Sequence, residues 1–505
     1  MRVVTAASAV VFLAAASLTT AAGSQAGEQG LLTAEPLETW QTDGIVWALE
    51  YAHGVVYVGG TFDHVRPPGA KAGERDVARK NFAAFDAVTG ELLPCAPSFT
   101  EAGNTVRALK TSPDGTVLYV GGSFGKVDGT GVASAVALDT ADCALRPDFR
   151  PAMAAPVRAI ETTDTAVYVG GDFTAVNGKP QQRIAAFTPS GTLLPFKADI
   201  DAPVWSLVAA LDHGKILVGG DFTKVNTKES RGLAALDPTT GATVRVYPGW
   251  LPIRSGVKAL VRDGVNFYVG AEGRGTGIFD GRIAGRLSDD AMLWKDWCWG
   301  ATQALALHNG VLYSGSHAHD CSQTPGGFPE VNDRQHFLAN SVADKHILHW
   351  FPDTDDGTGE GNGPRALEMA GGILWAGGEF TEVNDSPQQS LTRFSAGPAG
   401  AAPDAAPRLS LAETGAGEVT LSWRAAWDRD DAELTYLLYR DGDLVAAPTQ
   451  RSTAWSRPTM KFTDAVEPGA RHQYTIVVTD GSHTTRPSEP LDVRAVADER
   501  PAGER

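Results

Sequence analysis

Positive charge is in short supply in this chain. Lysine and arginine number 43 among 505 residues, against 60 aspartates and glutamates, and the formal net charge is −17. Proteins that bind nucleic acid present basic surfaces to the phosphate groups. The acidic balance therefore argues against nucleic acid as the main partner.

Long apolar runs are missing after the first residues. Val3 to Leu18 is apolar, follows the charged start Met1-Arg2 and leads into the small residues Thr19 to Ala22, which is the order of a secretory signal peptide. The run is too short for a permanent membrane anchor. We therefore predict that residues 1–26 are a signal peptide, that the protein is secreted and extracellular, and that it does not insert into a membrane.

Cysteine is rare and helical periodicity is lacking. The four cysteines, Cys95, Cys143, Cys298 and Cys321, form an even set without the close paired spacing of a zinc site, and in an exported chain such a set favours disulfides over free thiols. Short apolar runs alternate with breaks rich in glycine, proline, asparagine and aspartate. These features predict an all-β fold.

What the chain has in abundance is a repeat. Seven short apolar strands run into glycine, and the first glycines of successive copies lie 45 to 62 residues apart. The copies are Tyr57-Val-Gly-Gly-Thr-Phe62, Tyr119-Val-Gly-Gly-Ser-Phe124, Tyr168-Val-Gly-Gly-Asp-Phe173, Leu217-Val-Gly-Gly-Asp-Phe222, Tyr268-Val-Gly-Ala271, Tyr313-Ser-Gly-Ser316 and Trp375-Ala-Gly-Gly-Glu-Phe380. Periods near 50 residues indicate a radial or stacked array.

Each copy contains four short strands, most clearly in the third copy: Val157 to Ile160, Ala166 to Gly171, Arg183 to Phe187 and Leu193 to Phe196. Seven such units predict a seven-bladed β-propeller over residues 31–396. The alternative all-β repeat, a solenoid, uses shorter rungs. The glycines then serve close approach of a neighbouring strand.

The repeat frame also makes two structural predictions. It favours Cys95–Cys143 and Cys298–Cys321 among the three possible connectivities, because each pair would tie one blade to the next. The last repeat, ending at Leu391 to Phe394, lacks a fourth strand. We expect the segment before Trp40 to supply it, with Trp40 in blade seven beside Phe394, because closure removes open sheet edges.

A second domain follows the repeats. Residues 397–407 are small residues and prolines typical of a linker, residues 408–497 contain alternating strands of one small sandwich, and residues 498–505 are predicted to be a disordered tail. The string Val466-Glu-Pro-Gly-Ala-Arg-His-Gln-Tyr474 and the tryptophan Trp423 resemble the fibronectin type III pattern. That resemblance implies a spacer or a binding platform.

The whole chain resembles a group of secreted actinobacterial β-propellers with the repeat Val-Gly-Gly-x-Phe-x-x-Val-Asn. The pattern stands at Val169 to Asn177, at Val218 to Asn226 and, with alanine first, at Ala376 to Asn384. The resemblance implies the fold and export, and it is nearly silent on activity, because one fold hosts many functions.

The repeat is most altered in its sixth copy, and we place the candidate site there. Gly315-Ser-His-Ala-His-Asp-Cys321 replaces the usual glycine motif, and an acidic loop, Phe351 to Asn362, follows the blade. Both segments should open on one rim formed by blades six, seven and one. The candidate ligand-binding residues are His317, His319, Asp320, Asp353, Asp355, Asp356 and Glu360.

These residue types also suggest a metal. His317, His319, Asp320, Asp353 and Asp355 offer nitrogen and carboxylate ligands for a divalent cation such as calcium; the acidic loop favours calcium and the histidines favour zinc. The calcium-loop spacing is not met, and a solvated acidic turn beside hydrogen-bonded histidines is the alternative. Asp428-Arg-Asp-Asp431 in the second domain has the same two interpretations.

Two further signals are ambiguous. Trp250, Trp294, Trp297, Trp299 and Trp350 would stack on sugar rings if exposed, or fill the core between blades. Gly121 to Gly125 has the spacing of a nucleophile elbow, but Ser123 holds a repeat position occupied elsewhere by Thr61, Asp172 and others, so we assign it to the scaffold.

We therefore expect a secreted, non-catalytic recognition protein whose propeller binds an extracellular or cell-surface glycan, as a lectin does, or a protein. An extracellular hydrolase or lyase acting on a polysaccharide through carboxylates and histidines of blades six and seven is the first alternative. A subunit of a larger secreted assembly is the second.

Overall fold

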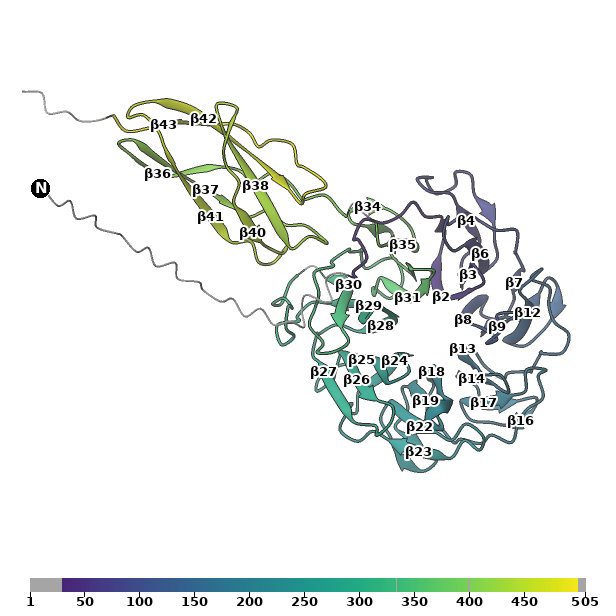
Figure 1. Cartoon of the computed structure of the whole chain (residues 1–505). Helices are drawn as coiled ribbons and strands as arrows, with labels where there is room; N and C mark the ends of the chain where they lie inside the picture. Colours follow the sequence, from purple (N-terminus) through teal and green to yellow (C-terminus); the bar gives the residue numbers. More distant parts are fainter. Residues whose placement is uncertain (1–29, 333, 398–399, 498–505) are drawn as a thin grey trace, which may run out of the picture.

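The computed structural model describes residues 30–332, 334–397 and 400–497. In these ranges the chain is built of β-strands with one short 3-10 segment, Leu211–His213 (Figure 1). No helix in the described ranges is long and apolar enough to cross a membrane. The predicted signal peptide, residues 1–26, and the predicted tail, residues 498–505, lie outside the described residues.

The main sheets of the repeat region are seven antiparallel blades arranged around a ring, with smaller two- and three-stranded sheets at their edges (Figure 1). Each innermost strand contacts the innermost strand of the next sheet, and the seventh contacts the first. The described part of the repeat region is therefore a β-propeller with one blade per sequence repeat. In blade order the strands are β2 (Ile45–Ala52), β3 (Val55–Thr61) and β6 (Phe82–Asp86); β8 (Thr105–Thr111), β9 (Val117–Ser123) and β12 (Ala135–Asp139); β13 (Val157–Thr162), β14 (Val167–Gly171) and β17 (Ile184–Phe187); β18 (Val204–Ala210), β19 (Lys215–Gly220), β22 (Leu233–Leu236) and β23 (Thr243–Val246); β24 (Ser255–Arg262), β25 (Asn266–Gly273), β26 (Gly281–Arg286) and β27 (Met292–Asp296); β28 (Thr302–His308), β29 (Val311–Ala318) and β30 (Gln335–Ser341); β31 (Pro364–Ala370), β32 (Ile373–Gly378) and β35 (Leu391–Ser395).

The glycine of each motif allows two blades to approach. A Cβ at Gly59 would overlap Val106 of the next inner strand, and one at Gly377 would overlap Val46 across the junction of blades seven and one. Substitution at these positions would push the neighbouring blade outward. The glycines therefore act as scaffold, as the repeat predicts.

The Val-Asn part of the repeat builds a small hairpin at the edge of the blade. In blade four it joins β20 (Lys224–Val225) to β21 (Lys228–Glu229), and Asn226 and Thr227 both have positive φ, as a type I′ turn requires. The Asn226 side chain accepts a hydrogen bond of 2.8 Å from Asp199 N. Blades three and seven repeat this contact at Asn177 and Asn384, so the asparagine fastens the incoming chain to the blade.

The N-terminal segment completes the last blade. Thr33 N donates to Ser395 O at 2.9 Å and Leu37 N donates to Arg393 O at 2.8 Å, so the segment runs antiparallel to β35 and closes the ring. The predicted neighbour of Trp40 is wrong. Its ring lies 6.4 Å from Phe85 of blade one, whereas Phe394 packs against Trp350, because the antiparallel direction carries residue 40 past the start of β35.

Two disulfides join neighbouring blades. Cys95 is bonded to Cys143 with a Cα–Cα distance of 5.6 Å, and Cys298 is bonded to Cys321 with a Cα–Cα distance of 4.1 Å. This is the pairing that the repeat frame favours.

The C-terminal unit consists of two antiparallel sheets (Figure 1). Their inner faces share one apolar core that includes Trp423, Tyr436 and Tyr474. The first sheet holds β36 (Ser410–Gly415), β37 (Glu418–Arg424) and β41 (Thr459–Ala465); the second holds β39 (Asp443–Ala446), β38 (Glu433–Arg440), β42 (Arg471–Thr479) and β43 (Leu491–Arg494), with β40 (Thr449–Arg451) paired to β38.

The C-terminal unit packs on blade six. The Trp455 ring lies 4.6 Å from the Phe351 ring and 4.8 Å from the Phe328 ring. Phe351 N donates to Arg429 O at 2.8 Å. The sixth-blade insertion and the start of the acidic loop therefore contact the second domain.

Candidate functional site

Every innermost strand of the propeller carries a β-bulge at the same place. A bulge adds one residue that is not paired across the sheet and redirects its side chain. The seven bulged residues line one cavity of about 100 Å³, and we call them the mouth ring because they lie where the inner strands begin. They are Trp47, Arg107, Arg158, Trp205, Lys258, Gln303 and Arg365.

A second ring surrounds the first. It consists of the residue that follows the two-residue glycine motif of each repeat. We call it the carboxylate ring because four of its seven members are aspartate or glutamate. Its members are Thr61, Ser123, Asp172, Asp221, Glu272, His317 and Glu379. Because each blade places this residue at the end of its second strand, it lies beside the bulge of the first strand.

Most cations of the mouth ring are paired with the carboxylate ring. Arg158 donates two hydrogen bonds of 2.7 Å to Asp172. Arg365 donates to Glu379 at 2.7 Å and to Glu360 at 3.0 Å. These are charge-assisted bonds, so they hold the side chains in fixed positions.

Lys258 and Gln303 share Glu272. The Lys258 ammonium lies 3.8 Å from this carboxylate and the Gln303 amide donates to it at 2.8 Å. Burial raises the pKa of Glu272, but Lys258, Gln303 and Arg274 outweigh burial and hold that pKa below its ordinary value. Glu272 is therefore ionised at neutral pH.

The two tryptophans of the mouth ring stack against cations. The Arg158 guanidinium carbon and the Lys258 ammonium lie 4.0 and 3.9 Å from the Trp205 ring centroid. Arg107 lies 4.2 Å from the Trp47 ring centroid. Cation–π contacts use the ring faces, so these faces are not open to a sugar ring.

Arg107 differs from the other cations of the mouth ring. Among the described residues its guanidinium makes no hydrogen bond or ion pair with a carboxylate, because Thr61 and Ser123 occupy the carboxylate-ring positions of blades one and two. Burial is the main cause that lowers the pKa of Arg107, and nearby Arg158 and Arg365 lower it further. Glu360 and Asp172 act in the opposite direction without bonding to Arg107. The mouth ring therefore has one cation without a directly bonded carboxylate.

The opposite end of the inner strands opens into a larger cavity of about 650 Å³. Glu50 forms an ion pair with Lys110 there, with a nitrogen–oxygen distance of 3.3 Å. Burial, followed by repulsion from Glu50, raises the pKa of Glu368, and burial also raises the pKa of Glu161.

The sequence-predicted residues fall into separate places around this site. His317 is a member of the carboxylate ring, and its Nε2 accepts a hydrogen bond from Ala301 N at 3.2 Å. Burial lowers the pKa of His317 to about 4, so the ring is neutral at neutral pH. His319 and Asp320 lie further along and pair their backbones with Trp299.

Asp353 and Asp356 meet at a histidine outside the predicted set. They accept from the two ring nitrogens of His336, each at 3.1 Å. His336 is buried; burial lowers its pKa, but the two carboxylates outweigh burial and raise the pKa above its ordinary value. These two hydrogen bonds hold the acidic loop against blade six.

Asp355, one of the candidate ligand-binding residues, makes a backbone contact that another blade repeats. Its Oδ1 accepts from Thr381 N at 2.6 Å and from Glu382 N at 3.0 Å. Asp201 makes the same two contacts with Thr223 and Lys224 in blade four. Glu360, in contrast, reaches the mouth through Arg365.

The structure does not gather the predicted metal ligands. In the described part of the chain, the group of three or more histidine, cysteine or acidic side chains within reach of one ion is Asp428, Asp430 and Asp431. His317, His319, Asp320, Asp353 and Asp355 are not in it. Of the tryptophans considered for sugar stacking, Trp250, Trp294 and Trp350 are buried in the core.

Sequence reasoning missed the mouth ring although a signal was present. In each copy, a large or polar residue stands among the first four residues of the inner strand, as in Val46-Trp-Ala48 and Val157-Arg-Ala159. Repeated positions are assigned to the scaffold on sequence grounds, as at Ser123, so these residues are not among the candidates. In a closed ring, the bulged position of the seven inner strands directs seven side chains toward one axis.

Comparisons with known proteins bear on the fold. A family model described as "Domain of unknown function (DUF5122) beta-propeller" matches residues 214–239, which span β19 and β22. No curated protein matches the chain.

Three solved structures are similar at low identity. A crystal structure of the computationally designed Ika8 protein has 15% identity, covers 72% of this chain and 99% of that chain, and has a TM-score of 0.42. A chain in a crystal structure of a mitotic checkpoint complex has 13% identity, with 77% of this chain and 99% of that chain covered and a TM-score of 0.47. Saccharomyces cerevisiae Sqt1 has 12% identity, with 73% and 100% covered and a TM-score of 0.41. Together with the ring of sheets, the family match identifies the repeat region as a β-propeller.

Proposed function

We propose that this protein is a secreted, non-catalytic recognition protein whose mouth ring binds an acidic group carried by an extracellular glycan. The observation that carries the proposal is Arg107, which among the described residues has no hydrogen-bonded or ion-paired carboxylate, whereas the other cations of the mouth ring do. A guanidinium recognises a carboxylate or sulfate through two parallel hydrogen bonds. The missing ion-pair partner is the kind that an acidic ligand supplies.

The size of the cavity favours a group on a larger molecule. About 100 Å³ accommodates one charged substituent, so the rest of the ligand must lie on the face of the propeller. The covered faces of Trp47 and Trp205 favour recognition by charge over stacking on a sugar ring. Because the whole protein has a net charge of −17, a glycan with sparse acidic groups suits it better than a dense polyanion.

The state of the carboxylates supports binding without catalysis. Asp172 and Glu379 are bound to arginine, and the pKa of Glu272 is lowered. A glycosidase needs a general acid whose pKa is raised. The hydrolase alternative draws support from the other end of the channel, where the pKa of Glu368 is raised beside Glu50.

The remaining parts of the proposal concern export and the second domain. Two disulfides suit an oxidising compartment, which agrees with a signal peptide at residues 1–26. We assign residues 408–497 to a fibronectin type III-like module because the buried Tyr474 donates through its hydroxyl to Asp464 at 2.7 Å and shares one apolar core with the buried Trp423. This module serves as a spacer or a second contact.

Binding to an array of acidic and neutral glycans tests the function. The native chain should bind acidic glycans and release no products. Arg107→Gln should weaken binding about tenfold or more, because a hydrogen bond to a charged group contributes about 1.5–3 kcal/mol. Arg424→Gln, at an exposed arginine of β37, is the matched control and should bind as the native chain does.

Two results would refute this function. Equal binding by Arg107→Gln would place the ligand elsewhere. Cleavage of a bound glycan, abolished by Glu368→Gln, would establish the hydrolase instead.

A further inference from the structure

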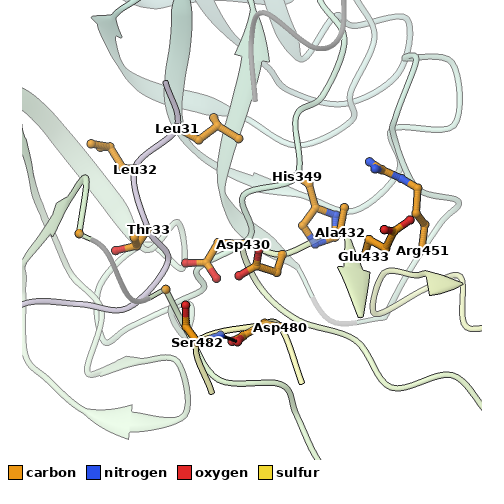
Figure 2. Close-up of a pocket in the computed structure, with 13 residues that line it drawn as sticks. Leu31, Leu32, Thr33, His349, Asp430, Ala432, Glu433, Arg451, Asp480 and Ser482 are labelled. Carbon is orange, nitrogen blue, oxygen red and sulfur yellow. Dashed lines mark hydrogen bonds between the residues drawn. The ribbon is translucent and has the colours of Figure 1, made fainter. Parts of the chain in front are cut away.

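The two domains meet at a cavity of about 410 Å³ whose lining is rich in carboxylates (Figure 2). Thr33 of the propeller, His349 of blade six, and Asp430, Asp431 and Asp480 of the C-terminal unit all contribute to it. The loop Asp428 to Asp431 connects β37 to β38. We propose that this loop binds one calcium ion through the carboxylates of Asp428, Asp430 and Asp431 and thereby fastens the C-terminal unit to the propeller.

The three carboxylates are arranged as ligands of one ion. One oxygen from each lies within 4.8 Å of the others. Calcium takes oxygen ligands at about 2.3–2.6 Å, so two oxygens on opposite sides of the ion lie about 5 Å apart. The separations of the three oxygens are therefore within the span of one calcium ion.

Asp428 supplies a second, independent observation. The residue is only 1% exposed. Oδ1 accepts from Asp430 N at 2.9 Å and from Asp431 N at 3.0 Å. Oδ2 is buried and has no hydrogen-bond partner among the described residues. A buried carboxylate oxygen without a partner is costly unless a cation or a proton satisfies it.

The electrostatics favour a cation over no ligand. The oxygens of Asp428, Asp430 and Asp431 that lie within 4.8 Å of one another repel each other when all three carboxylates are ionised. A divalent ion would relieve this repulsion. The all-oxygen group favours calcium over zinc, which selects nitrogen and sulfur.

The position of the loop explains why the ion would act on the domain junction. Asp430 Oδ2 accepts from Ala34 N at 2.5 Å, in the segment that closes the propeller ring. Its Oδ1 accepts from Ala401 N of the linker at 3.0 Å. The backbone oxygen of Asp428 is 3.0 Å from His349 Nε2. A calcium ion fixing Asp430 would therefore fix three segments at once.

Calcium titration of the full chain, after removal of metal with a chelator, tests the site. Calorimetry should show one ion per chain, with a dissociation constant at or below about 1 mM, the weak limit of extracellular calcium modules. Asp431→Asn should weaken the affinity at least tenfold. Asp385→Asn is the matched control: it lies at the same junction and pairs with Arg429, but it is outside the group, so its affinity should not change.

A second measurement keeps the test valid if Asp431→Asn fails to fold. Terbium bound at this loop should emit when Trp427, the residue before Asp428, is excited. Calcium should displace it, and Trp427→Phe should reduce the emission by more than half without changing the calcium affinity. The proposal fails if the native chain binds no calcium, if Asp431→Asn binds as tightly, or if Trp427→Phe emits as strongly.

Discussion

At the scale of single residues, repetition in this protein has two opposite meanings. Asp355 repeats the backbone contacts of Asp201 and stabilises the chain in each place. Arg107 also stands at a repeated position, but its neighbours Thr61 and Ser123 differ from the acids of other blades. A specific site therefore arises where the backbone position is equivalent in all seven blades but the side chain differs from blade to blade.

His317 illustrates how burial sets a charge state at such a position. The folded state lowers its pKa from 6.5 to about 4. Between these values the unfolded chain takes up a proton that the folded chain does not, so the histidine contributes stability above pH 6.5 that is lost as the pH falls toward 4.

We predict that His317→Gln flattens this pH dependence. Between about pH 7 and pH 5, the free energy of unfolding of the native chain should fall by about 2 kcal/mol more than that of the variant. Urea unfolding of both proteins measures it, and the comparison cancels the opposite effect of His336. His53→Gln, at an exposed histidine, should keep the native slope. Equal slopes in the native chain and His317→Gln would contradict the assigned burial.

At the scale of elements, the blades are held by short connections of defined geometry. Asn226 both adopts the positive φ of its turn and accepts from Asp199 N. The N-terminal segment pairs with β35 of blade seven as the fourth strand pairs with the third in blades four and five. A ring without this segment would expose the edge of β35.

Deletion of residues 31–41 should lower the melting temperature of the propeller by at least about 5 °C. Burial of Leu32 alone contributes about 1.5–3 kcal/mol, and about 1 kcal/mol corresponds to about 2–4 °C in a domain of this class. Leu37→Pro removes one N–H donor to Arg393 and should give a smaller change in the same direction. Scanning calorimetry measures both, and an unchanged melting curve would refute closure by this segment.

At the scale of the whole molecule, the ring and the sandwich meet through aromatic contacts and hydrogen bonds. Trp455 contacts Phe351 and Phe328, and Arg429 shares hydrogen bonds with the backbone of Phe351. Domains of one chain move relative to each other unless the interface between them is large and apolar.

Trp455→Ala should separate the unfolding of the two domains. Each aromatic pair contributes about 0.5–1.5 kcal/mol beyond area burial, so the loss of two pairs should move the melting transitions apart in calorimetry. Leu444→Ala, at an exposed position of β39, should leave the native profile. Identical profiles for the native chain and Trp455→Ala would show that the interface does not couple the domains.

The sequence alone determined the features that every repeat must share. Each blade has to present a glycine where the next blade approaches and an asparagine or its equivalent where the chain turns, so the roles of Gly59 and Asn226 follow from the repeat itself. The same frame favoured the cysteine pairs, because it says which outer strands are neighbours.

Only the tertiary structure decided where chemistry gathers. Trp47 and Arg365 are far apart in the chain and meet because the ring closes, and Asp430 meets Ala34 because the second domain folds back on the propeller. Periodicity reports which residues occupy equivalent positions. It does not report the bulge that turns them toward one axis, or the docking of one domain on another, because these depend on contacts between segments hundreds of residues apart.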